Sequence, residues 1–205
     1  MYSLEDMGET MKYEWENDEY NQEVWELMTH IDEGLEKSLC GLREASEAGS
    51  TLAAICLSDI LFDGRHGASR NIPEAISWAR HAAQNGSIEG GFLLAEYLEK
   101  TGDFNAAQEE YAKLAKRGYS PAMYRLALDY WAEKGVERDV AKSIEYFSKA
   151  INSGHLHAKA DFARLKRAGE FGFWSRISGV VDFFALIIPM MVMFLWYPAG
   201  QLVRK

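Results

Sequence analysis

Apolar and small residues recur along the middle of this chain in blocks of similar length. The blocks end at four glycines that lie 37, 32 and 36 residues apart, namely Gly49, Gly86, Gly118 and Gly154. A small residue follows each glycine by four positions and a large apolar residue follows it by eight: Ala53, Gly90, Ala122 and Ala158, then Leu57, Leu94, Leu126 and Phe162. A period of this size predicts stacked supersecondary units, because one such unit cannot bury its apolar face alone.

Signals for helix starts divide the blocks into pairs of helices. Asn71, Asp103 and Asp139 have short side chains that can accept hydrogen bonds from the first free amides of a helix, and Pro73 fits a first helical turn. The glycine that ends each block tolerates the left-handed backbone that closes a helix. We therefore expect antiparallel helix pairs at 51–63 with 73–85, at 87–100 with 104–117 and at 120–134 with 139–153.

The residues around these positions resemble the Sel-like repeat family, whose members are short relatives of the tetratricopeptide repeat. The clearest unit is PAMYRLALDYWAEKGVERDVAKSIEYFSKAINSG, from Pro121 to Gly154. A second unit, 51–86, keeps DGRHG and RNIPEAISWARHAAQNG, and the unit at 87–118 has a shorter turn, in EKTGDFNAAQEEYAKLAKRG. The resemblance covers 41–169 and implies an all-α solenoid of antiparallel helix pairs that does adaptor or scaffolding work.

The N-terminal part of the chain differs from the repeats in composition. Residues 1–37 hold twelve acidic and two basic side chains, and the rest of the chain holds 19 acidic and 20 basic ones. The segment 1–23 is expected to be a solvated, flexible tail or, because aromatic residues alternate with its acids, an interaction segment. Helical apolar spacing returns in 24–49, which predicts a capping region of one or two helices before the repeats of 50–169.

This distribution of charge argues against nucleic acid as a partner. The repeats carry almost no net charge, whereas binding to phosphates requires a stripe of basic side chains. The two cysteines, Cys40 and Cys56, provide no disulfide framework and are expected to be free thiols in a reducing compartment.

The C-terminal part contains a long apolar segment. Residues 177–199 include one charged residue, Asp182, near the beginning of the segment. Their number suits the ~30 Å hydrocarbon core of a bilayer, and Trp174 and Trp196 suit its two interfaces. We expect a single transmembrane helix at 177–199 followed by a short basic tail at 200–205; the alternative is a hydrophobic capping or dimerisation helix. Basic residues before the span favour repeats in the cytoplasm, at a bacterial inner membrane.

Few residues show a spacing typical of catalysis or metal binding. His155 and His157 lie close together at a turn, without a third metal ligand nearby in the sequence. The DGRHG segment lacks the Gly-Lys-Ser/Thr ending of a phosphate-binding loop, and we interpret it as a turn. We therefore expect no enzyme activity and no cofactor.

The resemblance also implies where a partner binds. In tetratricopeptide-like stacks the first helix of each pair lines the concave face, and positions 3, 6, 10 and 13 after the glycine share one side of that helix. From these positions we select the following residues and name them the predicted binding face: Ile55, Asp59, Phe62, Glu89, Phe92, Glu96, Glu99, Tyr124, Leu128, Trp131, Ala160, Arg164 and Arg167. Its aromatic and acidic side chains suit a partner segment with apolar and basic residues. The alternative is that Phe92, Tyr124 and Trp131 pack between repeats.

Two hypotheses of function follow. The first is a membrane-anchored scaffold whose repeats hold a protein partner, as in an envelope or surface-polysaccharide regulatory assembly. The second is a regulatory subunit whose span packs against a membrane enzyme or transporter. The identity of the proteins recovered with the chain from native membranes distinguishes the two.

Overall fold

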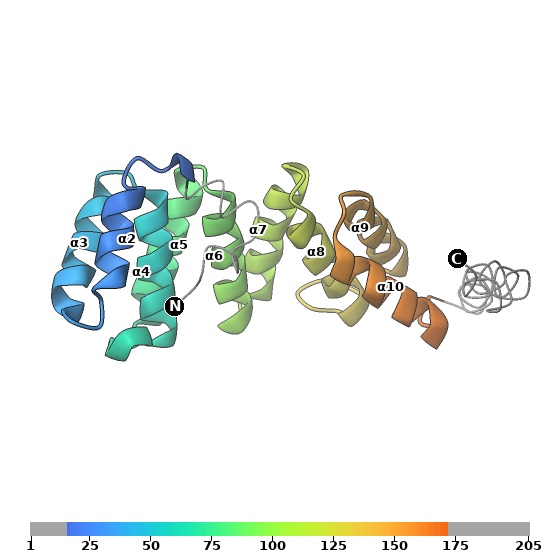
Figure 1. The fold of residues 1–205 in the computed structure, drawn as a ribbon. Coiled ribbons are helices and arrows are strands. Elements are labelled where there is room, and N and C mark those ends of the chain that lie inside the picture. The colour runs from blue at the N-terminus through green and yellow to red at the C-terminus, as the bar shows by residue number, and fades with distance from the viewer. Residues whose placement is uncertain (1–15, 172–205) are drawn as a thin grey trace, which may run out of the picture.

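The regular structure of the described part of the chain, residues 16–171, consists of helices. In this computed structural model the helices stack side by side into an elongated solenoid, with α2 and α3 at one end and α10 at the other (Figure 1). The elements are α2 (Asn21–Thr29), α3 (Leu35–Glu47), α4 (Thr51–Asp63), η1 (Arg65–Gly67), α5 (Ile72–Gln84), α6 (Ile88–Lys100), α7 (Phe104–Lys116), α8 (Ser120–Ala132), α9 (Val140–Asn152) and α10 (Leu156–Ala168). The expected all-α solenoid is confirmed for these residues.

The three helix pairs expected from the sequence are α4 with α5, α6 with α7 and α8 with α9. Each observed boundary lies within two residues of the expected one. The predicted cap residues act as expected, because the side chains of Asn71, Asp103 and Asp139 accept hydrogen bonds from the backbone amides of Glu74, Ala106 and Lys142, at 3.3, 3.2 and 3.0 Å. Local sequence signals thus set where the second helix of each pair begins.

The first helix of three repeats begins directly after the repeat glycine. Ser50, Ser87 and His155 follow the glycine by one position, and each side chain accepts a hydrogen bond from a backbone amide of the helix that it precedes. Gly49, Gly86, Gly118 and Gly154 have φ angles of 114°, 96°, 90° and 85°. Glycine occupies these positions because an L side chain is strained in this backbone region.

The small residues four positions after the repeat glycines lie where neighbouring helices approach each other. Ala53, Ala122 and Ala158 are fully buried. At Gly90 the approach leaves no room for a side chain, because an added Cβ atom would lie 2.5 Å from the Cβ atom of Ala82 on α5. A larger side chain here would push the helices apart, so the repeat pattern reflects helix spacing.

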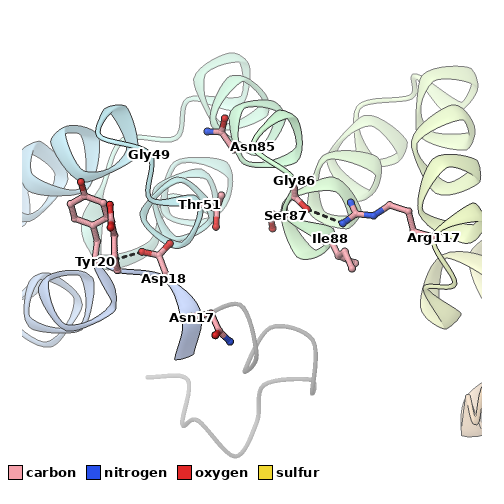
Figure 2. A pocket seen from close by; sticks show the side chains of 11 residues that line it. Asn17, Asp18, Tyr20, Gly49, Thr51, Asn85, Gly86, Ser87, Ile88 and Arg117 are labelled. Atoms are coloured by element: carbon pink, nitrogen blue, oxygen red, sulfur yellow. Dashed lines mark hydrogen bonds between the residues drawn. The ribbon is translucent and has the colours of Figure 1, made fainter.

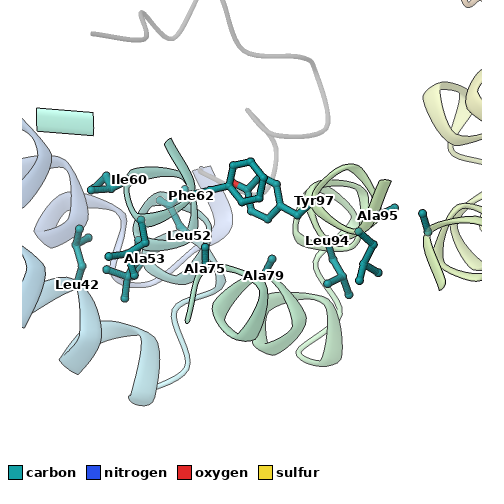
Figure 3. Packing of buried hydrophobic residues seen from close by; sticks show 14 of the residues in the cluster. Leu42, Leu52, Ala53, Ile60, Phe62, Ala75, Ala79, Leu94, Ala95 and Tyr97 are labelled. Carbon is teal, nitrogen blue, oxygen red and sulfur yellow. The ribbon is translucent and has the colours of Figure 1, made fainter. Parts of the chain in front are cut away.

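The helix α8 connects the two main parts of the core. One cluster of buried residues runs from α2 to α8, and Leu42, Leu52 and Leu94 are among its members (Figure 3). A second cluster joins α8 to α9 and α10 through Phe147 and Leu165. Ala122 and Leu126 of α8 belong to the first cluster, whereas Met123 and Ala127 belong to the second.

The membrane segment expected from the sequence lies outside the described residues. Within 16–171, no helix has both the length and the apolar character needed to cross a bilayer. The span at 177–199 and the tail at 200–205 are not among these residues, so the structure does not test them.

The tight packing at Ala122 leads to a prediction about stability. Replacing Ala122, which is fully buried, with leucine inserts a larger side chain between helices and should reduce the free energy of unfolding by about 1 to 3 kcal/mol. Glu109→Ala, at an exposed position of α7, should change it by less than about 0.5 kcal/mol. Thermal denaturation of both variants measures the difference. Equal shifts in melting temperature would show that the assigned repeat register is wrong.

Candidate protein-binding face

The residues of the predicted binding face differ in exposure from one end of the solenoid to the other. On α4, Ile55 and Phe62 are only 4% and 3% exposed. The members on α6 and α8 are half-buried, and Ala160, Arg164 and Arg167 on α10 are exposed. The apolar members on α4 are covered because helices lie on both sides of α4, whereas α10 is the last described helix. These positions therefore do not form one uniformly open surface.

The acids of the predicted binding face accept hydrogen bonds from neighbouring repeats. Glu89 accepts one from the Tyr119 hydroxyl at 2.9 Å, and Glu96 accepts one from the Arg125 guanidinium at 2.5 Å. Asp59 is likewise paired within its own repeat, with the Arg65 guanidinium at 2.8 Å. These interactions within the solenoid occupy part of each carboxylate. A partner could contact only the part that is still exposed to solvent.

Two aromatic residues of the predicted binding face lie between repeats. The Phe92 ring centroid lies 5.6 Å from that of Tyr111 on α7 and 5.5 Å from that of Tyr119. Tyr124 on α8 stacks on His155 with centroids 4.7 Å apart, and its hydroxyl donates a hydrogen bond to Asp161 on α10 at 2.5 Å. The structure thus places both rings in inter-repeat contacts, which the sequence left as the alternative.

The half-buried Leu128 and Trp131 lie on α8, against the second core cluster. Within residues 16–171, the Trp131 Nε1 atom is a buried donor without a hydrogen-bond partner. Further along, the Arg164 side chain is 63% exposed although it forms an ion pair with Asp161 at 3.1 Å. The part of the predicted binding face that is most open to solvent therefore lies on α10 and is basic, and it is next to half-buried apolar members on α8.

The buried acid Asp129 was missed by the sequence analysis. It lies eleven positions after Gly118, where the other repeats have Ile60, Tyr97 and Leu165, and it is only 7% exposed. Burial, supported by nearby Glu99 and opposed by Lys134 and Arg125, raises the pKa of its carboxyl to about 7. The sequence contained the signal, because the position eleven residues after the repeat glycine is charged in this repeat and apolar in the other three.

The charges around Asp129 connect the second and third repeats. Glu99 on α6 accepts hydrogen bonds from the Tyr111 hydroxyl at 3.3 Å and from the Lys134 ammonium at 3.1 Å. Arg125 reaches Glu99 at 4.0 Å in addition to its bond with Glu96. Two cations thus lie among several acids at this interface, so its stability depends on the protonation state of Asp129.

His155 of the histidine pair and the DGRHG segment have structural roles. His155 Nδ1 accepts a hydrogen bond from the Ala158 amide at 3.0 Å and thereby caps α10. Gly64 takes a left-handed conformation at the end of α4, and Arg65–Gly67 form a short 3₁₀ turn, as interpreted from the sequence. Within the described residues, no group of three His, Cys, Asp or Glu side chains could hold a metal ion.

Comparisons with known proteins find matches to two of the repeats and to much of the solenoid. The Sel1 repeat model matches residues 52–87 and 120–155. A relative described as an uncharacterised protein of Neisseria meningitidis serogroup B is 31% identical over 125 residues, which are 60% of this chain and 26% of the relative. The chain thus spans about a quarter of the length of this relative.

Two solved structures share the fold. A Sel1 repeat protein from Oxalobacter formigenes superposes with a TM-score of 0.58 at 22% identity, over 68% of this chain and 59% of the other. A protective antigen of uropathogenic Escherichia coli, c5321, gives a TM-score of 0.60 at 23% identity, over 71% of this chain and 33% of the other. At these identities the likeness shows the solenoid fold alone.

The buried carboxyl of Asp129 leads to a prediction about pH. Its folded pKa of about 7 lies above the ordinary value of 3.8, so the folded protein binds this proton more tightly than the unfolded chain. Stability is therefore greatest below pH 4 for this group and is lost as the pH rises through 7. Through this group the natural protein should lose on the order of 2 to 3 kcal/mol of its free energy of unfolding between pH 5 and pH 8. Asp129→Asn, which cannot ionise, should not show this part of the loss.

Urea denaturation at the two pH values, with Glu109→Gln as an exposed control, measures this effect. The expected result is that the stability difference between Asp129→Asn and the natural protein grows in favour of the variant as the pH rises. If this difference is the same at pH 5 and pH 8, Asp129 is not the titrating group.

Proposed function

We propose that this chain, in which residues 52–87 and 120–155 are Sel1 repeats, is a membrane-anchored scaffold that holds a protein partner on its repeats. The fold is suited to protein–protein interaction, because stacked repeats present an extended surface. The observation that carries the proposal is the series of side-chain contacts between successive repeats: Glu89–Tyr119, Glu96–Arg125 and Tyr124–Asp161.

These contacts support binding because they fix the first helices of the repeats relative to one another. Each contact joins residues about 30 or more positions apart in the sequence, from α6 to α8 or its N-cap residue Tyr119, or from α8 to α10. A surface that is ordered before the partner arrives loses less conformational entropy on association. The polar side chains of the predicted binding face thus stabilise the shape of the surface and also give it its charge.

The charge of this surface changes along the solenoid. Asp59 and Glu96 make it acidic at α4 and α6, and Arg164 and Arg167 make it basic at α10, with Leu128 between them. A partner that matches this pattern is an extended segment whose apolar residues contact α8 and whose basic residues lie over α4 and α6. Such complementarity contributes to the rate and specificity of association.

The membrane anchor rests on the apolar segment at 177–199. The last described helix ends at Ala168, shortly before this segment begins. The segment has the length and composition of a single span, and the basic residues before it favour repeats on the cytoplasmic side. The alternative function, a regulatory subunit of a membrane enzyme or transporter, uses the same span as a packing surface.

Photo-crosslinking in native membranes tests the proposal. A photoreactive amino acid replaces Leu128 in the full chain, and the same replacement at Glu109 on α7 is the matched control. We expect the chain to remain in the membrane fraction after alkaline carbonate extraction. We expect the probe at 128 to give a discrete protein adduct that the probe at 109 does not give.

The identity of the adduct separates the two functions. A soluble protein favours the scaffold, and a polytopic membrane protein favours the regulatory subunit. Adducts of equal yield from both positions would show that the predicted binding face is not the binding surface. Release of the chain by carbonate would contradict the anchor.

A further inference from the structure

The side chain of Asp18 binds at the start of the first repeat. Its carboxylate accepts a hydrogen bond from the backbone amide of Leu52 at 3.1 Å and one from the Ser50 hydroxyl, whose oxygen lies 3.0 and 3.1 Å from the two carboxylate oxygens. It also accepts one from the Tyr20 amide at 2.9 Å. A negative charge is favourable here, because the free amides and the dipole of α4 make its N-terminus positive. Part of the acidic N-terminal region is therefore held on the solenoid.

A pocket of about 480 Å³ extends from Asp18 to the start of the next repeat (Figure 2). It lies on the edge of the solenoid where the repeat glycines Gly49 and Gly86 end their blocks, and these residues provide no side chains to fill it. Figure 2 shows Asn17 and Asp18 on one side of the pocket and Arg117 on the other, with Ser87 between them. The pocket thus begins at the residues where the described chain begins.

The far side of this pocket repeats the chemistry that holds Asp18. Ser87 follows Gly86 as Ser50 follows Gly49, and both hydroxyls accept a hydrogen bond from the amide three residues later, at 2.8 and 3.0 Å. Arg117 adds a positive charge, and its guanidinium donates a hydrogen bond to the Gly86 carbonyl at 2.9 Å. The lining of the pocket contains one cation, Arg117, and two acids, Asp18 and Glu19. Glu89 in the first turn of α6 is a further acid close to Ser87 in the sequence, and its carboxylate accepts a hydrogen bond from the Tyr119 hydroxyl.

We propose that the acidic segment 1–15 of this chain docks in this pocket and places a carboxylate beside Ser87 and Arg117. The segment holds four acidic residues and one basic residue, Lys12, so its charge complements that of Arg117. The segment joins the described chain beside the pocket, because Asn17 is one of the residues that line it. An extended chain covers about 3.3 Å per residue, so an acid four to nine residues before Asp18, such as Glu14 or Glu9, can reach the next repeat.

This docking gives the N-terminal region a place on the solenoid that is separate from the predicted binding face. In the proposed docking, the acidic segment would follow the edge formed by the helix starts of α4 and α6. Most of the predicted binding face lies further along the first helices, and only Glu89 is next to the pocket, because it follows Ile88. The inference does not depend on the proposed partner or on the membrane span.

Hydrogen exchange of the full chain in detergent, followed by mass spectrometry, tests the proposal. We expect the amides of residues 1–15 to exchange more slowly than those of an unstructured peptide of the same sequence. Arg117→Glu should reduce this protection by about fivefold, and 0.5 M salt should reduce it in the natural protein. Lys116→Glu, an exposed charge reversal next to the pocket, should leave it unchanged.

Arg117→Lys keeps the charge and should retain most of the protection, which separates docking from a general loss of stability. Exchange of residues 1–15 at the unstructured rate in the natural protein would overturn the proposal. Equal protection in the natural protein and in Arg117→Glu would also overturn it. Protection that falls on tenfold dilution would assign the pocket to the segment of a second copy and overturn docking within one chain.

Discussion

Successive helices in this solenoid approach each other closely because the residue four positions after each repeat glycine is alanine or glycine. Ala53, Ala122 and Ala158 are fully buried, and at Gly90 even a Cβ atom would lie 2.5 Å from Ala82. Close approach lets each repeat cover the apolar face of the next, so the core extends along the chain. The positions of the surface side chains depend on this spacing.

The same spacing brings polar side chains of neighbouring repeats within hydrogen-bonding distance. Glu96 meets Arg125 and Tyr124 meets Asp161 at the edges of the helix contacts. It also buries Asp129, whose neighbours at Glu99 and Lys134 come from both sides of the interface. The interfaces between repeats therefore combine apolar packing with charged groups, and the interactions of these groups depend on burial and pH.

The sequence was sufficient to predict the helices, because their start and stop signals are local. Asn71, Asp103 and Asp139 cap the helices that they were expected to cap. The surface was harder to predict, because a position on one side of a helix is open only if no neighbour covers it. Phe92 and Tyr124 share that side with Arg164, yet the two rings lie between repeats and Arg164 is exposed. The contact of Asp18 with Ser50 joins residues 32 positions apart, and no local pattern indicated it.

The central claim is that side-chain contacts couple successive repeats into one ordered surface, and a double-mutant cycle on Tyr124 and Asp161 tests it most directly. Tyr124→Phe and Asp161→Asn remove the hydroxyl and the charge while keeping the side-chain shapes, and unfolding of both single variants and the double variant gives the coupling energy. The contact is a hydrogen bond to a carboxylate between α8 and α10, so the account predicts a coupling of about 1 to 3 kcal/mol. Additive effects, with a coupling below about 0.3 kcal/mol, would contradict it.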